Sequence, residues 1–255
     1  MAIILKNSHE IKLMRNSGRL AQRILNQLGA AAQAGVSTHE LDLMARRYLE
    51  EAGATSPFLG YGGRNHPPFP GAICTSVNEA VVHGVPTKDP LKNGDIVALD
   101  VGAKLQGWLG DTAGTFPVGE ISTSAQRLLR VTKEALYLGI EQAKVGNRVG
   151  DIAHAVQTHI ENHGYHVVRD LVGHGVGRSL HEEPSVPNFG SKNSGPKLRP
   201  GMTFAIEPMV NAGTAKVIYL DDGWTCLSAD RSLSAHFEHT IAVLSDGPEI
   251  LTLDE

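Results

Sequence analysis

One ten-residue pattern occurs twice in this chain, 107 residues apart. LKNGDIVALD at 91–100 and LRPGMTFAIE at 198–207 share a leucine, a basic residue, a glycine, an alanine, an aliphatic residue and a final acid. Chance is the alternative explanation, because strands that open after a glycine turn look alike. A repeated order of two helices followed by strands favours duplication. The pattern therefore predicts a single domain over 1–255, built of two halves (about 8–120 and 121–250) related by a pseudo-twofold axis.

Hydrophobic spacing outlines the elements of each half. Apolar positions at helical spacing predict helices at 8–33 and between Ser37 and Gly53 in the first half, and at about 122–144 and 150–163 in the second. Ser37 and Glu40 have the spacing of a capping box, and Gly53, Gly146 and Gly164 mark helix ends. Strand-like runs are predicted near 73–82, 95–101, 109–116, 165–170, 202–211, 215–220 and 235–244.

Four of the strand-like segments carry an acid. VALDVG contains Asp100, GDTAGTF contains Asp111, FAIEPM contains Glu207 and FEHTIAV contains Glu238. A carboxylate in an apolar strand is costly to bury unless it is paired or bound to a cation. Together with His174 in VGHGVG, the four acids resemble a set of metal ligands, and they indicate a metallohydrolase.

Turn positions predict that the acids form two pairs. A hairpin centred between Leu105 and Gln106 would place Asp100 directly opposite Asp111. A hairpin centred on the Asp-Gly turn at 222–223 would place Glu207 opposite Glu238. Opposed side chains have Cβ atoms about 4.5–5.5 Å apart, where like charges are destabilising, so each pair would attract a cation.

Oxygen ligands with one imidazole suit Mn²⁺, Fe²⁺, Co²⁺ or Zn²⁺, and four carboxylates suffice for two ions. Each residue taken alone also has an ordinary structural explanation. Asp111 could cap a turn, Glu238 could pair with a neighbouring histidine, and His174 could be a structural histidine between glycines. The constellation is more specific than any one member.

Composition excludes several other functions. The chain has 255 residues, 41% hydrophobic and 20% charged, and a net charge of -4 without any basic run, which argues against binding to nucleic acid. No segment reaches the roughly 18 apolar residues of a membrane span, and the N-terminus does not resemble a signal peptide. Two cysteines form no disulfide framework, so we expect a cytoplasmic protein.

From about residue 8 to its end, the chain resembles the methionine aminopeptidases of the short type I form. The segments that carry the resemblance are SVNEAVVHGVP (76–86), GDIVALDVG with GDTAGTF, GHGVGRSLHEEP (173–184), AIEPM (205–209) and DRSLSAHFEHT (230–240). The resemblance implies an α+β duplicated pita-bread (creatinase/aminopeptidase) fold, in which helices back an antiparallel sheet and two divalent metal ions (Co, Mn, Fe or Zn) occupy a central cleft. It also implies removal of the initiator methionine from nascent proteins whose second residue is small.

The resemblance assigns a role to each residue of the site. Asp100 would chelate one metal, His174 and Glu207 the other, and Asp111 and Glu238 would bridge both. A bridging hydroxide would attack the scissile carbonyl, and Glu207 would assist proton transfer. His181 would hold the carbonyl and its oxyanion, and His83 would contact the scissile amide. The pocket for the methionine side chain would combine Tyr61, Phe69, Cys74, Leu180 and Trp224.

The chain departs from the family's usual pattern at the pocket. Leu180 stands where an aromatic residue is common and Phe58 where a small residue can occur, and the 62–71 loop is longer than in the most compact members. These departures leave the shape of the pocket open. They do not affect the metal ligands.

Two competing functions differ in features of the sequence. An X-Pro peptidase on the same fold normally has a substantial additional N-terminal domain, whereas only about 70 residues precede SVNEAVVHGVP. A non-catalytic scaffold that binds peptides would have lost metal ligands, and all five are present here. We therefore expect a monomeric enzyme whose partners are the N-terminal methionine of nascent chains and, through them, the ribosome.

Overall fold

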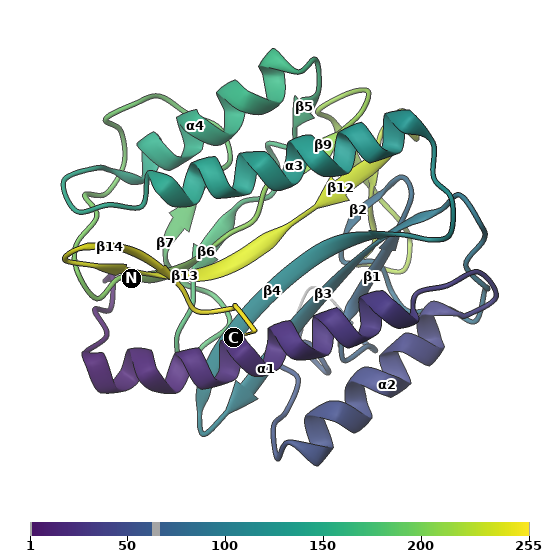
Figure 1. Cartoon of the computed structure of the whole chain (residues 1–255), viewed down its shortest axis with the longest axis horizontal. Coiled ribbons are helices and arrows are strands. Elements are labelled where there is room, and N and C mark those ends of the chain that lie inside the picture. The colour runs from purple at the N-terminus through teal and green to yellow at the C-terminus, as the bar shows by residue number, and fades with distance from the viewer. Residues whose placement is uncertain (1, 63–66, 255) are drawn as a thin grey trace.

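The computed structural model describes residues 2–62 and 67–254. One curved antiparallel sheet, in the order β1-β3-β4-β13-β8-β6-β7 with β14 added beside β13, runs through the molecule. Helices α1 and α2 lie along one half of the sheet and α3 and α4 along the other (Figure 1). The α+β pita-bread expectation is confirmed, while the origin of the two halves by duplication stays a prediction.

The four helices lie where the periodicity predicts them. They are α1 (Ser8–Ala31), α2 (Thr38–Glu51), α3 (Thr123–Glu141) and α4 (Val149–Asn162). Ser37 Oγ accepts a hydrogen bond from the Glu40 amide, and the Glu40 carboxylate accepts one from the Ser37 amide. This is the predicted capping box. None of the described helices combines the length and apolarity needed to cross a membrane.

The strands are short except for two. They are β1 (Cys74–Val77), β2 (Ala80–Val82), β3 (Ile96–Leu105), β4 (Trp108–Pro117), β5 (His166–Val167), β6 (Gly173–Gly175), β7 (Glu182–Val186), β8 (Thr203–Ile206), β9 (Met209–Asn211), β10 (Val217–Tyr219), β11 (Cys226–Ser228), β12 (Ser234–His236), β13 (Glu238–Leu244) and β14 (Gly247–Ile250). Strands β10-β11-β2 and β12-β9-β5 form two small sheets beside the main one.

The predicted centre of the first hairpin is wrong by one residue. Strand β3 pairs with β4 so that Leu105 faces Trp108, and the turn is Gln106-Gly107. Both turn residues have positive φ, as the tightest hairpin turns require, and glycine at the second position allows it without steric cost. Asp100 therefore faces Ala113 rather than Asp111, and the two acids are diagonal neighbours on one face of the sheet.

The second predicted hairpin is confirmed at its centre. The Leu220 amide bonds to the Thr225 carbonyl across the Asp-Gly turn, and β10 pairs with β11 in the same register. This register continues through β9 with β12 and through β8 with β13, where Ile206 faces His239. It places Glu207 opposite Glu238, as predicted.

The two hairpins meet at the middle of the sheet. Strand β4 pairs with β13, and Ala113 faces Glu238. Each helix pair buries its apolar stripe against its own hairpin: Leu25 and Leu28 of α1 pack with Leu99 of β3, and Leu136 and Ile140 of α3 pack with the β8 and β13 side chains. Each hairpin is thus packed against its own helices, and the pairing of β4 with β13 joins the two halves.

Candidate active site

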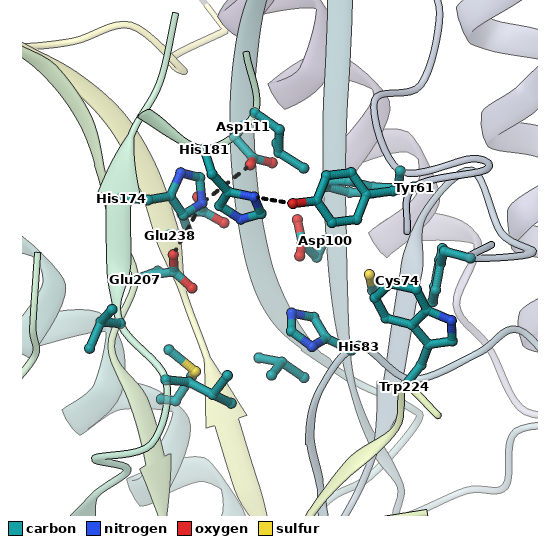
Figure 2. Close-up of a pocket in the computed structure, with 17 residues that line it drawn as sticks. Tyr61, Cys74, His83, Asp100, Asp111, His174, His181, Glu207, Trp224 and Glu238 are labelled. Carbon is teal, nitrogen blue, oxygen red and sulfur yellow. Dashed lines mark hydrogen bonds and ion pairs between the residues drawn. The ribbon is translucent and has the colours of Figure 1, made fainter. Parts of the chain in front are cut away.

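A cavity of about 150 Å³ opens between the two hairpins, and residues of both hairpins line it. Its described lining contains all twelve residues predicted for the site, shown in Figure 2. The lining residues are Phe58, Tyr61, Phe69, Cys74, Val82, His83, Asp100, Asp111, Leu171, Val172, His174, Leu180, His181, Glu207, Met209, Trp224 and Glu238.

The acids and His174 lie together at one side of the cavity (Figure 2). Strand β3 supplies Asp100, β4 supplies Asp111, the junction of β8 and β9 supplies Glu207, and β13 begins at Glu238. The Nε2 atom of His174, on β6, lies 3.4 Å from a Glu207 oxygen and 4.0 Å from an Asp111 oxygen. The site thus draws on both halves of the chain.

The protein compensates the buried carboxylates only in part. One oxygen each of Asp100, Asp111 and Glu238 is buried without a hydrogen-bond partner. No lysine or arginine is among the described residues that line the cavity. Burial raises the pKa of Asp111 to about 7 and that of Glu207 to about 8, and burial with repulsion from the neighbouring acids raises the pKa values of Asp100 and Glu238 well above their usual range. At neutral pH the ionised set therefore requires a bound cation.

His174 is prepared as a neutral ligand. Its Nδ1 lies 3.1 Å from the Gly175 carbonyl oxygen, so a proton on Nδ1 directs the Nε2 lone pair towards the acids. Burial lowers its pKa to about 3, which keeps the imidazole neutral. Ligand atoms of Asp111, His174 and Glu238 all lie within 4.8 Å of one another. Carboxylates with one imidazole fit Mn²⁺, Fe²⁺, Co²⁺ or Zn²⁺.

Two further histidines border this cluster. Nδ1 of His181 lies 2.7 Å from the Tyr61 hydroxyl oxygen, and the His181 ring stands edge-on to His174 at 4.2 Å between centroids. His83 follows β2 with a φ of 58°, a left-handed conformation uncommon for a residue with a side chain. Burial lowers the pKa of His83 to about 4 and also lowers that of His181, so both rings are neutral hydrogen-bonding groups near pH 7.

The other side of the cavity is apolar. Phe69 and Trp224 pack edge to face with ring centroids 5.3 Å apart, and the indole nitrogen of Trp224 donates to the Pro67 carbonyl. Burial raises the pKa of Cys74 well above its usual value, so this side chain is an uncharged thiol. Phe58 and Leu180, which depart from the family pattern, both line this end. Residues 63–66 of the longer loop lie outside the described part of the chain.

Sequence reasoning missed one polar residue and part of the apolar lining. His236 is buried, its Nε2 has no hydrogen-bond partner, and this atom lies 3.6 Å from a Glu207 oxygen. Its position two residues before Glu238 could have pointed to it, because alternate residues share a face of a strand. The same rule relates Met209 to Glu207, whereas no local pattern marks Val82, Leu171 and Val172.

The fold and the buried ligand set are those of a metal-dependent hydrolase. Residues 12–245 match the model of metallopeptidase family M24. The prolidase of Pyrococcus furiosus superposes with a TM-score of 0.78 at 22% identity, covering 99% of this chain and 66% of that protein, and shows that the fold is shared.

More similar proteins define a branch of this family. The methionine aminopeptidase of Clostridium acetobutylicum is 50% identical over 99% of this chain and 100% of its own length, and methionine aminopeptidase 1 of Bacillus subtilis is 49% identical over 98% and 99%. The crystal structure of the methionine aminopeptidase from Rickettsia prowazekii superposes with a TM-score of 0.95 at 42% identity, over 99% of this chain and 100% of that one. The chain therefore belongs to metallopeptidase family M24 and, within it, to the methionine aminopeptidases.

Proposed function

We propose that this enzyme removes the initiator methionine from nascent chains whose second residue is small. The observation that carries the proposal is the position of an apolar, aromatic-edged slot directly beside the cluster of buried carboxylates. An unbranched thioether fits such a slot, and its sulfur gains from aromatic contacts with Phe69 and Trp224. Methionine aminopeptidase relatives similar over the full length support the same substrate.

Five side chains would hold two divalent ions. Asp100 would chelate one ion, His174 and Glu207 the other, and Asp111 and Glu238 would bridge them. The three orphaned carboxylate oxygens support this assignment, because each needs a partner that the described protein does not supply. Bound divalent ions lower the pKa of a shared water and provide a nucleophile near neutral pH.

The remaining polar groups act on the substrate. Glu207 would assist proton transfer, because its carboxylate lies at the ligand cluster and lines the cavity that would hold the substrate. His181 offers its Nε2 to the scissile carbonyl, because its Nδ1 is engaged by Tyr61. His83 would donate to or accept from the scissile amide from the opposite wall. The enzyme would work in the cytoplasm as a monomer, in association with the ribosome.

The test is release of methionine from a Met-Ala-Ser peptide by protein loaded with Mn²⁺, Fe²⁺, Co²⁺ or Zn²⁺. Glu207→Gln and His174→Ala should lose activity by at least about 100-fold, because each removes a group of the site. Glu50→Gln, an exposed change on α2, is the matched control and should keep full activity. Cleavage of an X-Pro dipeptide without methionine release under all four metals would overturn the substrate, and full activity in Glu207→Gln would overturn the mechanism.

A further inference from the structure

Helices α3 and α4 carry a second group of metal-ligating side chains, on the outside of the sheet (Figure 1). Glu134 of α3, His159 of α4 and His163, the C-cap residue of α4, each present one ligand atom within 4.8 Å of the others. Among the described residues, the only other group with this property is Asp111, His174 and Glu238. None of the three helical residues lines the central cavity.

The two histidines are arranged as a pair of ligands. They are four residues apart at the C-terminal end of α4, and their ring centroids are 4.4 Å apart. Nδ1 of His163 lies 2.7 Å from the His159 carbonyl oxygen, so this nitrogen donates and Nε2 carries the free lone pair. Metal-binding histidines commonly have their second nitrogen held in this way.

Glu134 brings the third ligand from the facing helix. One of its oxygens lies 3.0 Å from Nε2 of His159, and the other accepts a hydrogen bond of 2.8 Å from Arg130. Arg130 thus orients the carboxylate and leaves one oxygen directed at the imidazoles. A cation between Glu134 and His159 would take the place of the hydrogen between them, and the ring proton of His159 would move from Nε2 to Nδ1.

We propose that Glu134, His159 and His163 form a peripheral site for a borderline divalent ion, with Zn²⁺ or Ni²⁺ as the natural probes. Two imidazoles and a carboxylate are a common zinc ligand set, and water completes the coordination. All three side chains are only partly buried, so an ion can enter from solvent. Since the ligands come from both helices, the ion would clamp α3 to α4 and stabilise the second half of the chain.

The test compares three proteins by equilibrium dialysis against Zn²⁺: the unaltered chain, His163→Gln and His154→Gln. His163→Gln keeps the His159–Glu134 contact but removes a ligand. His154→Gln changes a histidine on the same helix that lies outside the cluster. We expect His163→Gln to bind one Zn²⁺ equivalent fewer than the other two proteins, with methionine release unchanged. Equal stoichiometry in all three proteins, or an equal loss in both variants, would overturn the proposal.

A second measurement identifies the ligands directly. In imidazole ¹H–¹⁵N spectra, Zn²⁺ should shift the ring signals of His159 and His163 and leave those of His154 in place. Glu134→Gln, which keeps the shape but removes the charge, should weaken this binding by at least about tenfold, because the loss of even a residue that only orients a ligand typically costs about 10- to 100-fold in metal affinity. Ring signals of His159 and His163 that do not respond to Zn²⁺ would exclude the site even if the protein bound extra metal elsewhere.

Discussion

Gly110 is where the packing of α1 most directly controls the site. It precedes Asp111 on β4, so it points towards α1 while Asp111 points into the cavity. A Cβ at Gly110 would overlap the Cα and N atoms of Gly18, and it would lie 2.8 Å from the carbonyl carbon of Ser17. These are backbone atoms, so no side chain can rotate aside and the helix itself must shift.

We expect Gly110→Ala to lower the free energy of unfolding by about 3 kcal/mol, the upper end of the usual cost of overpacking. For a chain of this size the melting temperature should fall by roughly 6–12 °C. The displaced strand should also move Asp111, and a shift of about 1 Å in a catalytic group can reduce activity by about 100-fold. Urea unfolding and methionine release, in the same metal-loaded buffer, measure both effects.

The matched control is Gly114→Ala on the same strand and face. A Cβ there would lie 3.4 Å from the Phe116 ring and 3.7 Å from Leu25, which are ordinary contacts. Because alanine is favoured over glycine in a strand, this variant should be between neutral and about 1 kcal/mol more stable. Equal unfolding free energies for Gly110→Ala and Gly114→Ala would refute the argument that close backbone approach determines the packing of α1.

Two further predictions concern the charges around the site. Lys6 donates to Glu182, which also accepts the Arg178 and Ser179 amides beside His181. Lys6→Met should therefore reduce kcat for methionine release by about 10- to 100-fold. Lys6→Arg, which keeps the charge, should retain most of the activity. Equal kcat values for Lys6→Met and Lys6→Arg would exclude the ion pair as the cause. The second prediction concerns metal-free protein, in which the raised carboxyl pKa values make the folded state bind more protons than the unfolded state. Its free energy of unfolding should fall as pH rises from about 4, the ordinary carboxyl pKa, to about 7–8, by up to about 1.4 kcal/mol per pH unit for each group. Urea unfolding that is flat from about pH 5 to about pH 8 would contradict the raised values.

The sequence alone determined the features that depend on local spacing. Apolar periodicity and caps such as Ser37 located the four helices, and the Asp-Gly turn at 222–223 fixed the register that places Glu207 opposite Glu238. The cost of burying acids in strands pointed to a metal before any geometry was known. These are properties of neighbouring residues, which a linear pattern records.

Only the tertiary structure decided how the pieces meet. Gln106 and Gly107 adopt positive φ values and form the first turn, so its centre lies one residue after the predicted one. Asp100 and Asp111 are therefore diagonal neighbours. The pairing of β4 with β13 brought the two hairpins together and placed Ala113 opposite Glu238. The β4–β13 contact joins residues more than 100 positions apart, and the centre of the first turn depends on the backbone angles of two residues. No local pattern specifies either.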